Sequence, residues 1–239
     1  MEKNQDTVRI NKYLSEAGVC SRRKADALLE SGRITIDGQV AQMGQKVLPG
    51  QEVCVDGRPV IPEEEEILIA FHKPEGIVCT SGHYEGNIID YIHYPKRIYP
   101  IGRLDKNSTG LILLTNQGEI VNKLLKASNY HEKEYIVTVD KDLTPEFIQG
   151  MRGGVPILDT VTRECEVVAL HRRTFRIVLT QGLNRQIRRM CEYFGYRVLT
   201  LQRVRVLNIT LGDLSVGEYR DVTAEEKAEL MRLLANSHQ

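Results

Sequence analysis

The stretch from Gly102 to Asn116, GRLDKNSTGLILLTN, is the most informative part of the sequence for the fold, because a polar segment is followed directly by an apolar one. Leu111 to Leu114 is a continuous apolar run, which is typical of a strand buried on both faces. A glycine at each end of the polar part lets the backbone turn sharply. The pattern predicts that Asp105 lies in a loop before a central strand, where Arg103 and Lys106 keep it ionised. An ordinary turn aspartate with solvated neighbours is the alternative.

The composition indicates a globular protein with a core of its own. The chain has 239 residues, of which 41% are hydrophobic, enough for one large domain and a small one. There is no apolar run of about 18 residues, and the polar N-terminus lacks a signal core. We therefore expect a cytoplasmic protein with no membrane association. The five cysteines are scattered, so we expect neither a zinc site nor disulfides.

Charge is distributed unevenly although the formal net charge is zero. Acidic residues cluster at 63–66 and near the C-terminus, whereas basic residues cluster at 22–24 and between 185 and 205. A neutral total counts mildly against a nucleic-acid-binding protein, but clustered cations on one face suffice for that role.

Residues 1–58 read as a small module of two helices followed by short strands. Ser21 is a good N-cap for a helix over Arg22 to Glu30, and Asp37-Gly38 is a hairpin-turn signal. Arg22, Arg23 and Lys24 fall in the first turn of that helix, where free N–H groups and cations together attract phosphate. Their alternative role is to solubilise the helix start.

The rest of the chain follows a predicted linker at 59–66, which has two prolines and four consecutive glutamates. From residue 67 to 239 strands outnumber helices, and most connections are hairpin-like. This predicts an α+β domain with a mixed, largely antiparallel sheet. Thr144-Pro145 predicts a helix that Gly150 ends, and Asn184 predicts the cap of a helix from Arg185 to Tyr193.

Three segments carry a resemblance to a known family. They are GRLD with STGLILLTN after it, KEYIV from Lys133, and GLNRQIRRM from Gly182. In this order and spacing they resemble the motifs of RNA pseudouridine synthases, in the branch that modifies ribosomal RNA. Residues 1–58 resemble the S4-type RNA-binding module of that branch. The resemblance implies an enzyme that isomerises uridine to pseudouridine in RNA, with a curved sheet and a cleft.

The resemblance also implies residue roles. Asp105 is the essential catalytic residue, Arg188 is the cation that pairs with it, with Arg185 as the alternative, and Tyr135 stacks on the uracil ring. Further substrate contacts are expected from Arg103, Leu179, Arg185 and Lys73. RNA contacts are expected from Arg9, Lys12, Ser21, Arg22, Arg23, Lys24 and Arg189.

The reaction gains and loses no atoms, so we expect no cofactor and no metal. The chain agrees, because it has no dinucleotide fingerprint, P-loop or metal-spaced His or Cys pair. We expect large-subunit (23S) ribosomal RNA as the substrate, with tRNA as a possible addition, and a monomer as the acting form. Two alternatives are an S4-type RNA-binding or ribosome assembly factor without chemistry, and a uridine methyltransferase.

Overall fold

The computed structural model describes residues 7–62, 65–80, 85–126 and 130–236, and the chain forms two compact units. The first unit is Met1–Glu66 with Tyr94–Ile98 and Asn116–Gly118, and the second is the remainder. Residues 63 and 64 of the predicted linker lie outside the described residues, and the predicted domain boundaries stay a prediction. Within the described ranges no helix is long and apolar enough to cross a membrane.

The described residues of the first unit form two helices and two small sheets. Its helices are α1 (Ile10–Glu16) and α2 (Arg22–Glu30). One sheet pairs β1 (Val8–Arg9) with β4 (Lys46–Val47), and the other has the order β3 (Gln39–Val40), β2 (Ile34–Ile36), β5 (Val53–Val55), β6 (Arg58–Pro59). The Ser21 side chain accepts a hydrogen bond from Lys24 N, which confirms the predicted cap. Asp37 and Gly38 both have positive φ, as the predicted hairpin turn requires.

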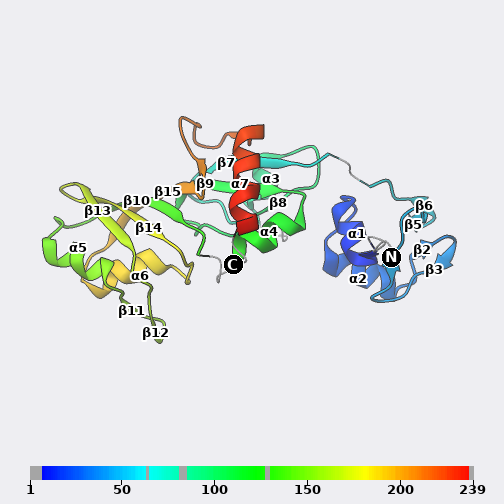
Figure 1. Ribbon diagram of the computed structural model, residues 1–239, viewed down its shortest axis with the longest axis horizontal. Helices are drawn as coiled ribbons and strands as arrows, with labels where there is room; N and C mark the ends of the chain where they lie inside the picture. The colour runs from blue at the N-terminus through cyan, green and yellow to red at the C-terminus, as the bar shows by residue number, and fades with distance from the viewer. Residues whose placement is uncertain (1–6, 63–64, 81–84, 127–129, 237–239) are drawn as a thin grey trace. The chain divides into compact units, whose positions relative to one another are not determined.

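The second unit is built on one mixed sheet (Figure 1). Its order is β13 (Glu166–His171), β14 (Thr174–Leu179), β10 (Lys133–Val139), β15 (Val198–Val206), β9 (Thr109–Thr115), β7 (Leu68–Lys73), β17 (Tyr219–Asp221). At its margins β16 (Ile209–Thr210) pairs with β15, and β8 (Tyr99–Pro100) pairs with β9. The β15–β9 pair is parallel, and the others are antiparallel. The predicted α+β class is therefore confirmed.

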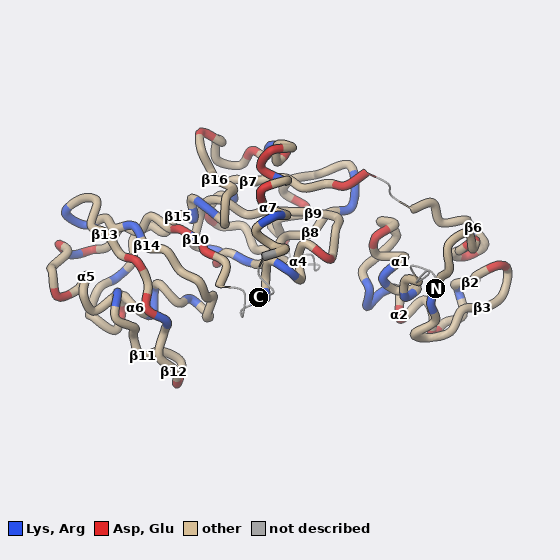
Figure 2. Tube along the Cα trace, viewed as in Figure 1, with Lys and Arg blue, Asp and Glu red and all other residues tan. Residues whose placement is uncertain are grey.

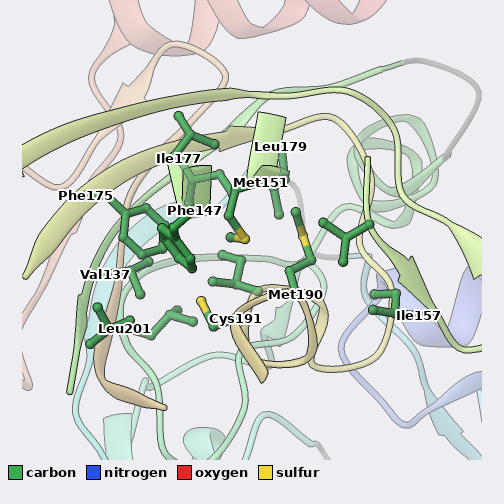
Figure 3. Close-up of a cluster of buried hydrophobic side chains, with 14 residues drawn as sticks. Val137, Phe147, Met151, Ile157, Phe175, Ile177, Leu179, Met190, Cys191 and Leu201 are labelled. Carbon is green, nitrogen blue, oxygen red and sulfur yellow. The ribbon is translucent and has the colours of Figure 1, made fainter. Parts of the chain in front are cut away.

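Two apolar clusters hold helices against this sheet. In the first, α5 (Pro145–Arg152) and α6 (Gln186–Tyr193) pack on β10, β13 and β14; Figure 3 shows Phe147 and Met190 among its side chains. In the second, α4 (Gly118–Leu125) and α7 (Ala224–Asn236) pack on β7, β9 and β16. The described part of this unit also contains a short helix, α3 (Ile88–Ile92), and a hairpin of β11 (Pro156–Ile157) and β12 (Thr160–Val161).

Strand β9 lies deep in the sheet, as its apolar run predicts. Leu111 to Leu114 are each no more than 1% exposed. Gly110 at its start has a φ of +106°, and a Cβ there would lie 2.2 Å from the carbonyl oxygen of Arg203 on β15. Glycine therefore permits the close parallel pairing of β9 and β15, which sets the loop before β9 beside β10 and α6.

Two predicted helix ends are wrong. Helix α5 continues through Gly150 to Arg152. A Cβ at Gly150 would meet the Phe194 ring at 2.5 Å, so the small size of this glycine serves packing and does not mark a helix end. Helix α6 is preceded by Arg185 in the left-handed conformation, and Asn184 does not cap it. None of the five cysteines is in a disulfide. Burial raises the pKa of the Cys191 thiol to about 12, which suits an unreactive side chain.

Candidate active site

A cavity of about 460 Å³ opens in the second unit, within the range typical of small-ligand sites. Its wall is made by the loop before β9, the starts of β10 and α6, the end of β14 and the middle of β15. Six residues that the sequence proposed line it: Arg103, Asp105, Tyr135, Leu179, Arg185 and Arg188. Residues more than 80 positions apart in the chain thus meet at one cavity.

Asp105 is half-buried in a loop that is fixed by its own backbone. The carbonyl oxygen of Asp105 accepts from Ser108 N at 3.0 Å, and Leu104 N donates to the Cys79 Sγ at 3.4 Å. Asp105 is the carboxylate among the described residues that line this cavity. Within that described set it has no ion pair at 4.0 Å or closer.

Arg188 holds this loop rather than the carboxylate itself. Its Nη2 donates to Asn107 O at 2.7 Å and to Ser108 Oγ at 3.3 Å. Its Nε is buried and has no hydrogen-bond partner within the described part of the chain. Burial and the positive charge of Arg185 lower the pKa of Arg188, while Asp105 acts in the opposite direction. The direct ion pair that the sequence predicts is not formed between these two described residues, and Nη2 of Arg188 is bonded to loop oxygens instead.

Tyr135 and Leu179 form a wall from two neighbouring strands. Tyr135 is half-buried on β10, and Leu179, 3% exposed, ends β14. In the register of these strands Lys133 pairs with Leu179 and Tyr135 with Ile177, so an aromatic and an aliphatic group face the cavity together. Such a surface suits a planar ring.

Of the remaining predicted substrate contacts, two lie at the cavity and one does not. Arg103 and Arg185 are exposed at the cavity, where both can reach an anion. Lys73 is misplaced by the prediction: it is fully buried, and its Nζ donates to the carbonyls of Pro74 at 2.7 Å, Ile77 at 3.0 Å and Lys106 at 3.4 Å. Burial lowers the pKa of Lys73. Its role in this structure is to hold the turn after β7 against the Asp105 loop.

The predicted RNA-contacting residues lie mainly on the first unit. Arg9, Ser21, Arg22, Arg23 and Lys24 are exposed, and Figure 2 shows the cations of α2 in blue. Lys12 pairs with Glu16 at 3.6 Å. Arg189 belongs to the second unit, does not line the cavity, and donates to Asn184 O at 3.0 Å and Asn184 Oδ1 at 3.2 Å.

Three cations at the cavity, Arg203, Lys133 and Lys126, were not assigned a role from the sequence. Arg203 is 3% exposed, and its Nε donates to Leu111 O at 2.7 Å. Lys133 begins β10, and burial together with the charge of Arg203 lowers its pKa to about 8. The sequence holds a signal for two of them: Lys133 stands two residues before Tyr135, and Arg203 lies in a predicted strand where it alternates with valines. Neither pattern shows that the side chain points into the protein.

This combination of fold and site defines an RNA-modifying enzyme. The family model described as RNA pseudouridylate synthase matches residues 67–193, and the S4 domain model matches residues 8–53. The chain belongs to the RNA pseudouridine synthase family, whose members isomerise uridine to pseudouridine in RNA. This excludes the predicted alternatives of a non-catalytic RNA-binding factor and a methyltransferase.

Particular relatives agree. The chain is 53% identical to the dual-specificity RNA pseudouridine synthase RluF of Escherichia coli K12 over 97% of this chain and 81% of the relative. It is 32% identical to the ribosomal large subunit pseudouridine synthase B of Bacillus subtilis, over 94% of this chain and 96% of that one. A crystal structure of a pseudouridylate synthase shares the fold with a TM-score of 0.69, at 24% identity over 95% of this chain and 99% of the other.

Proposed function

We propose that this protein makes pseudouridine in large-subunit (23S) ribosomal RNA and in a tRNA, with Asp105 as the catalytic carboxylate. The supporting observation is the placement of Asp105 at a cavity whose other charged lining residues are cations, Arg103, Lys126, Lys133, Arg185, Arg188 and Arg203. The positive charges around the cavity attract the negative charge of a carboxylate. An ionised carboxylate serves both routes to the product, attack on ribose C1′ and removal of the proton at C2′.

Arg188 is proposed to pair with Asp105 once a nucleotide enters. Its buried Nε lacks a partner in the described part of the chain, and an unpaired buried donor is unfavourable unless a ligand or a moving group satisfies it. A rotation of the Asp105 side chain would supply that acceptor. Arg185, exposed at the start of α6, is better placed for phosphate.

The wall of Tyr135 and Leu179 is proposed to receive the uracil ring after it leaves the RNA stack. A base taken out of its stack needs an apolar face to replace its neighbours. Arg103, exposed at the mouth of the cavity, is proposed to fill the gap in the RNA or to bind a phosphate.

The first unit is proposed to supply affinity rather than chemistry. Its exposed Arg22, Arg23 and Lys24 stand at the capped start of α2, where helix N–H groups and cations act together on phosphate. The names of the relatives support the choice of large-subunit rRNA and of more than one RNA target. We further propose that the protein acts as a monomer in the cytoplasm.

The test is an Asp105→Asn variant, which preserves shape and removes the ionised group. We expect no measurable pseudouridine in the variant and an RNA Kd within about threefold of wild type, since one neutralised carboxylate leaves the phosphate contacts intact. Product is quantified as tritium released from 5-³H-uridine in the RNA. Asp90→Asn, in α3, is the matched control. Turnover by Asp105→Asn would contradict the assignment. Pseudouridine mapping in rRNA and tRNA from cells with and without the gene tests the substrates.

A further inference from the structure

Lys133 occupies the part of the cavity where the uracil ring is proposed to lie. It is two residues before Tyr135 on β10, so both side chains project from the same face of the strand. Its cross-strand partner on β14 is Leu179. Tyr135, Leu179 and Lys133 all line the cavity. The ammonium group therefore belongs to the wall that faces the base, whereas the exposed Arg103 and Arg185 stand where the RNA backbone can reach them.

The donors of this ammonium group are poorly satisfied. Lys133 Nζ has three N–H donors, and within the described residues it makes one long hydrogen bond, to His131 O at 3.4 Å. Lys73, by contrast, uses its Nζ to bind three carbonyls. Lys133 also has no carboxylate within 4.0 Å in the described part of the chain. A half-buried cation with spare donors is prepared for an acceptor that arrives with the substrate.

The charges around Lys133 favour an anionic guest. Arg203 faces it from β15, and Arg188 lines the cavity from α6. His131 and Lys126 line it from the segment after α4, and Asp105 is the acidic residue on the opposite loop. Burial and the charge of Arg203 lower the pKa of Lys133 to about 8, so the group remains mostly protonated at neutral pH. Negative charge that develops near it gains more than it would in water.

We infer that Lys133 donates a hydrogen bond to a carbonyl oxygen of the uracil ring and stabilises the negative charge that the base carries while it is detached from the ribose. This inference rests on the proposed function. When the C1′–N1 bond breaks, its electron pair leaves with the base and spreads onto the ring oxygens. C1′ is then bonded to Asp105 or doubly bonded to a deprotonated C2′. After the base turns, C5 bonds to C1′. In the first route the C1′–Asp105 bond breaks as C5 attacks, and its electron pair returns to the carboxylate; in the second route the double bond is lost as Asp105 returns the C2′ proton to C2′ and becomes a carboxylate again. C5 then loses its proton and N1 gains one, so the base is neutral and the negative charge is back on Asp105.

The test compares Lys133→Met, Lys133→Arg and wild type in single-turnover tritium release and in RNA binding. Lys141→Met is the charge-matched control, because Lys141 follows the far end of β10 and hydrogen-bonds Gly195 O. We expect the Lys133→Met rate to fall about 10²- to 10³-fold, as for loss of one donor to a developing oxyanion. Its Kd and salt slope should match those of wild type. Thermal unfolding of each variant verifies folding.

Two further readouts separate this role from a structural one. The wild-type rate should fall as the pH rises through about 8, and this decline should be absent in Lys133→Arg, whose cation does not titrate there. Sulfur is a weak hydrogen-bond acceptor, so substrate RNA with either 2-thiouridine or 4-thiouridine, whichever replaces the oxygen that Lys133 contacts, should react more slowly with wild type. The same replacement should not lower the already reduced rate of Lys133→Met any further.

Three results would overturn the inference. The first is a Lys133→Met rate within about threefold of the wild-type rate. The second is an increased RNA Kd with the salt slope reduced by about one and the rate retained, because that combination marks a phosphate contact. The third is an equal loss of rate on both thio substrates in wild type and variant. Failure of wild type to form pseudouridine would instead refute the proposed function.

Discussion

Gly110→Ala is the substitution for which the structure gives the sharpest expectation. Gly110 starts β9 beside Arg203 of β15 with a φ of +106°. An alanine Cβ would lie 2.2 Å from Arg203 O and 2.6 Å from Arg203 N. These are backbone atoms of a buried, hydrogen-bonded strand, so they cannot move aside as a flexible side chain would. The two strands must separate or twist.

Two penalties set the size of the effect. A non-glycine residue at such a φ costs about 1–3 kcal/mol, and overpacking of a close contact costs about 1–3 kcal/mol more. We therefore expect Gly110→Ala to lower the free energy of unfolding by about 4 kcal/mol, which corresponds to a fall in Tm of about 8–16 °C for a domain of this size. The rate should fall too, because Arg203 and the Asp105 loop are displaced together.

Thermal unfolding followed by circular dichroism measures this, with Gly212→Ala as the control. Gly212 has a φ of +55°, and a Cβ there would meet nothing within 4 Å. That variant isolates the conformational penalty, which we expect to be about 1 kcal/mol. If Gly110→Ala and Gly212→Ala have the same Tm, the close approach of β9 and β15 does not constrain the fold as argued.

Four other expectations follow from the same geometry. Lys133→Met should raise Tm at pH 7, because a half-buried cation is removed. The pKa of Lys133 is about 8 in the folded protein against an ordinary value of 10.5, so the stability of wild type rises between these two pH values. The difference in Tm between wild type and the variant should therefore close over that range, which measurements of Tm against pH will show. Lys73→Met should lower the free energy of unfolding by about 3 kcal/mol in urea titrations, because three carbonyls lose their donor. Arg188→Gln should reduce the single-turnover rate by about 10²-fold or more while leaving Kd nearly unchanged. Replacing Arg22–Lys24 by alanines should raise the RNA Kd and reduce the salt slope by up to about three, with the rate at saturating RNA retained.

Local signals in the sequence predicted the local structure well. The apolar run of β9, the Ser21 cap and the Asp37-Gly38 turn depend on neighbouring residues, and all three are found. The mistakes arose where distant residues decide. Gly150 reads as a helix end, but its size is required by Phe194, 44 positions later in the chain.

In the candidate site too, the residues named by local motifs were predicted, and a residue whose position depends on distant strands was missed. Placement of Asp105, Tyr135 and Arg188 at one cavity agrees with the motifs that named them. The interior position of Lys133 could not be foreseen, because a lysine at a strand start is ordinarily solvated. Its burial depends on Leu179 and Arg203 from two other strands. A cation that lowers the stability of the fold is expected at functional sites, where activity and stability compete.

The loop around Asp105 is held at nearly every backbone step. Leu104 N donates a hydrogen bond to Cys79 Sγ, and the carbonyl of Asp105 accepts one from Ser108 N. The carbonyl of Lys106 accepts from Lys73 Nζ and Gly76 N, and the carbonyl of Asn107 accepts from Arg188. Lys73 and Arg188 thus grip one loop from two sides, and the carboxylate of Asp105 is the group that this scaffold leaves unpaired among the described residues. Catalysis benefits from such an arrangement, because a group that is already oriented loses little entropy when the substrate arrives. Removal of either cation should therefore act on turnover through the position of Asp105, and the effects of removing both should not be additive.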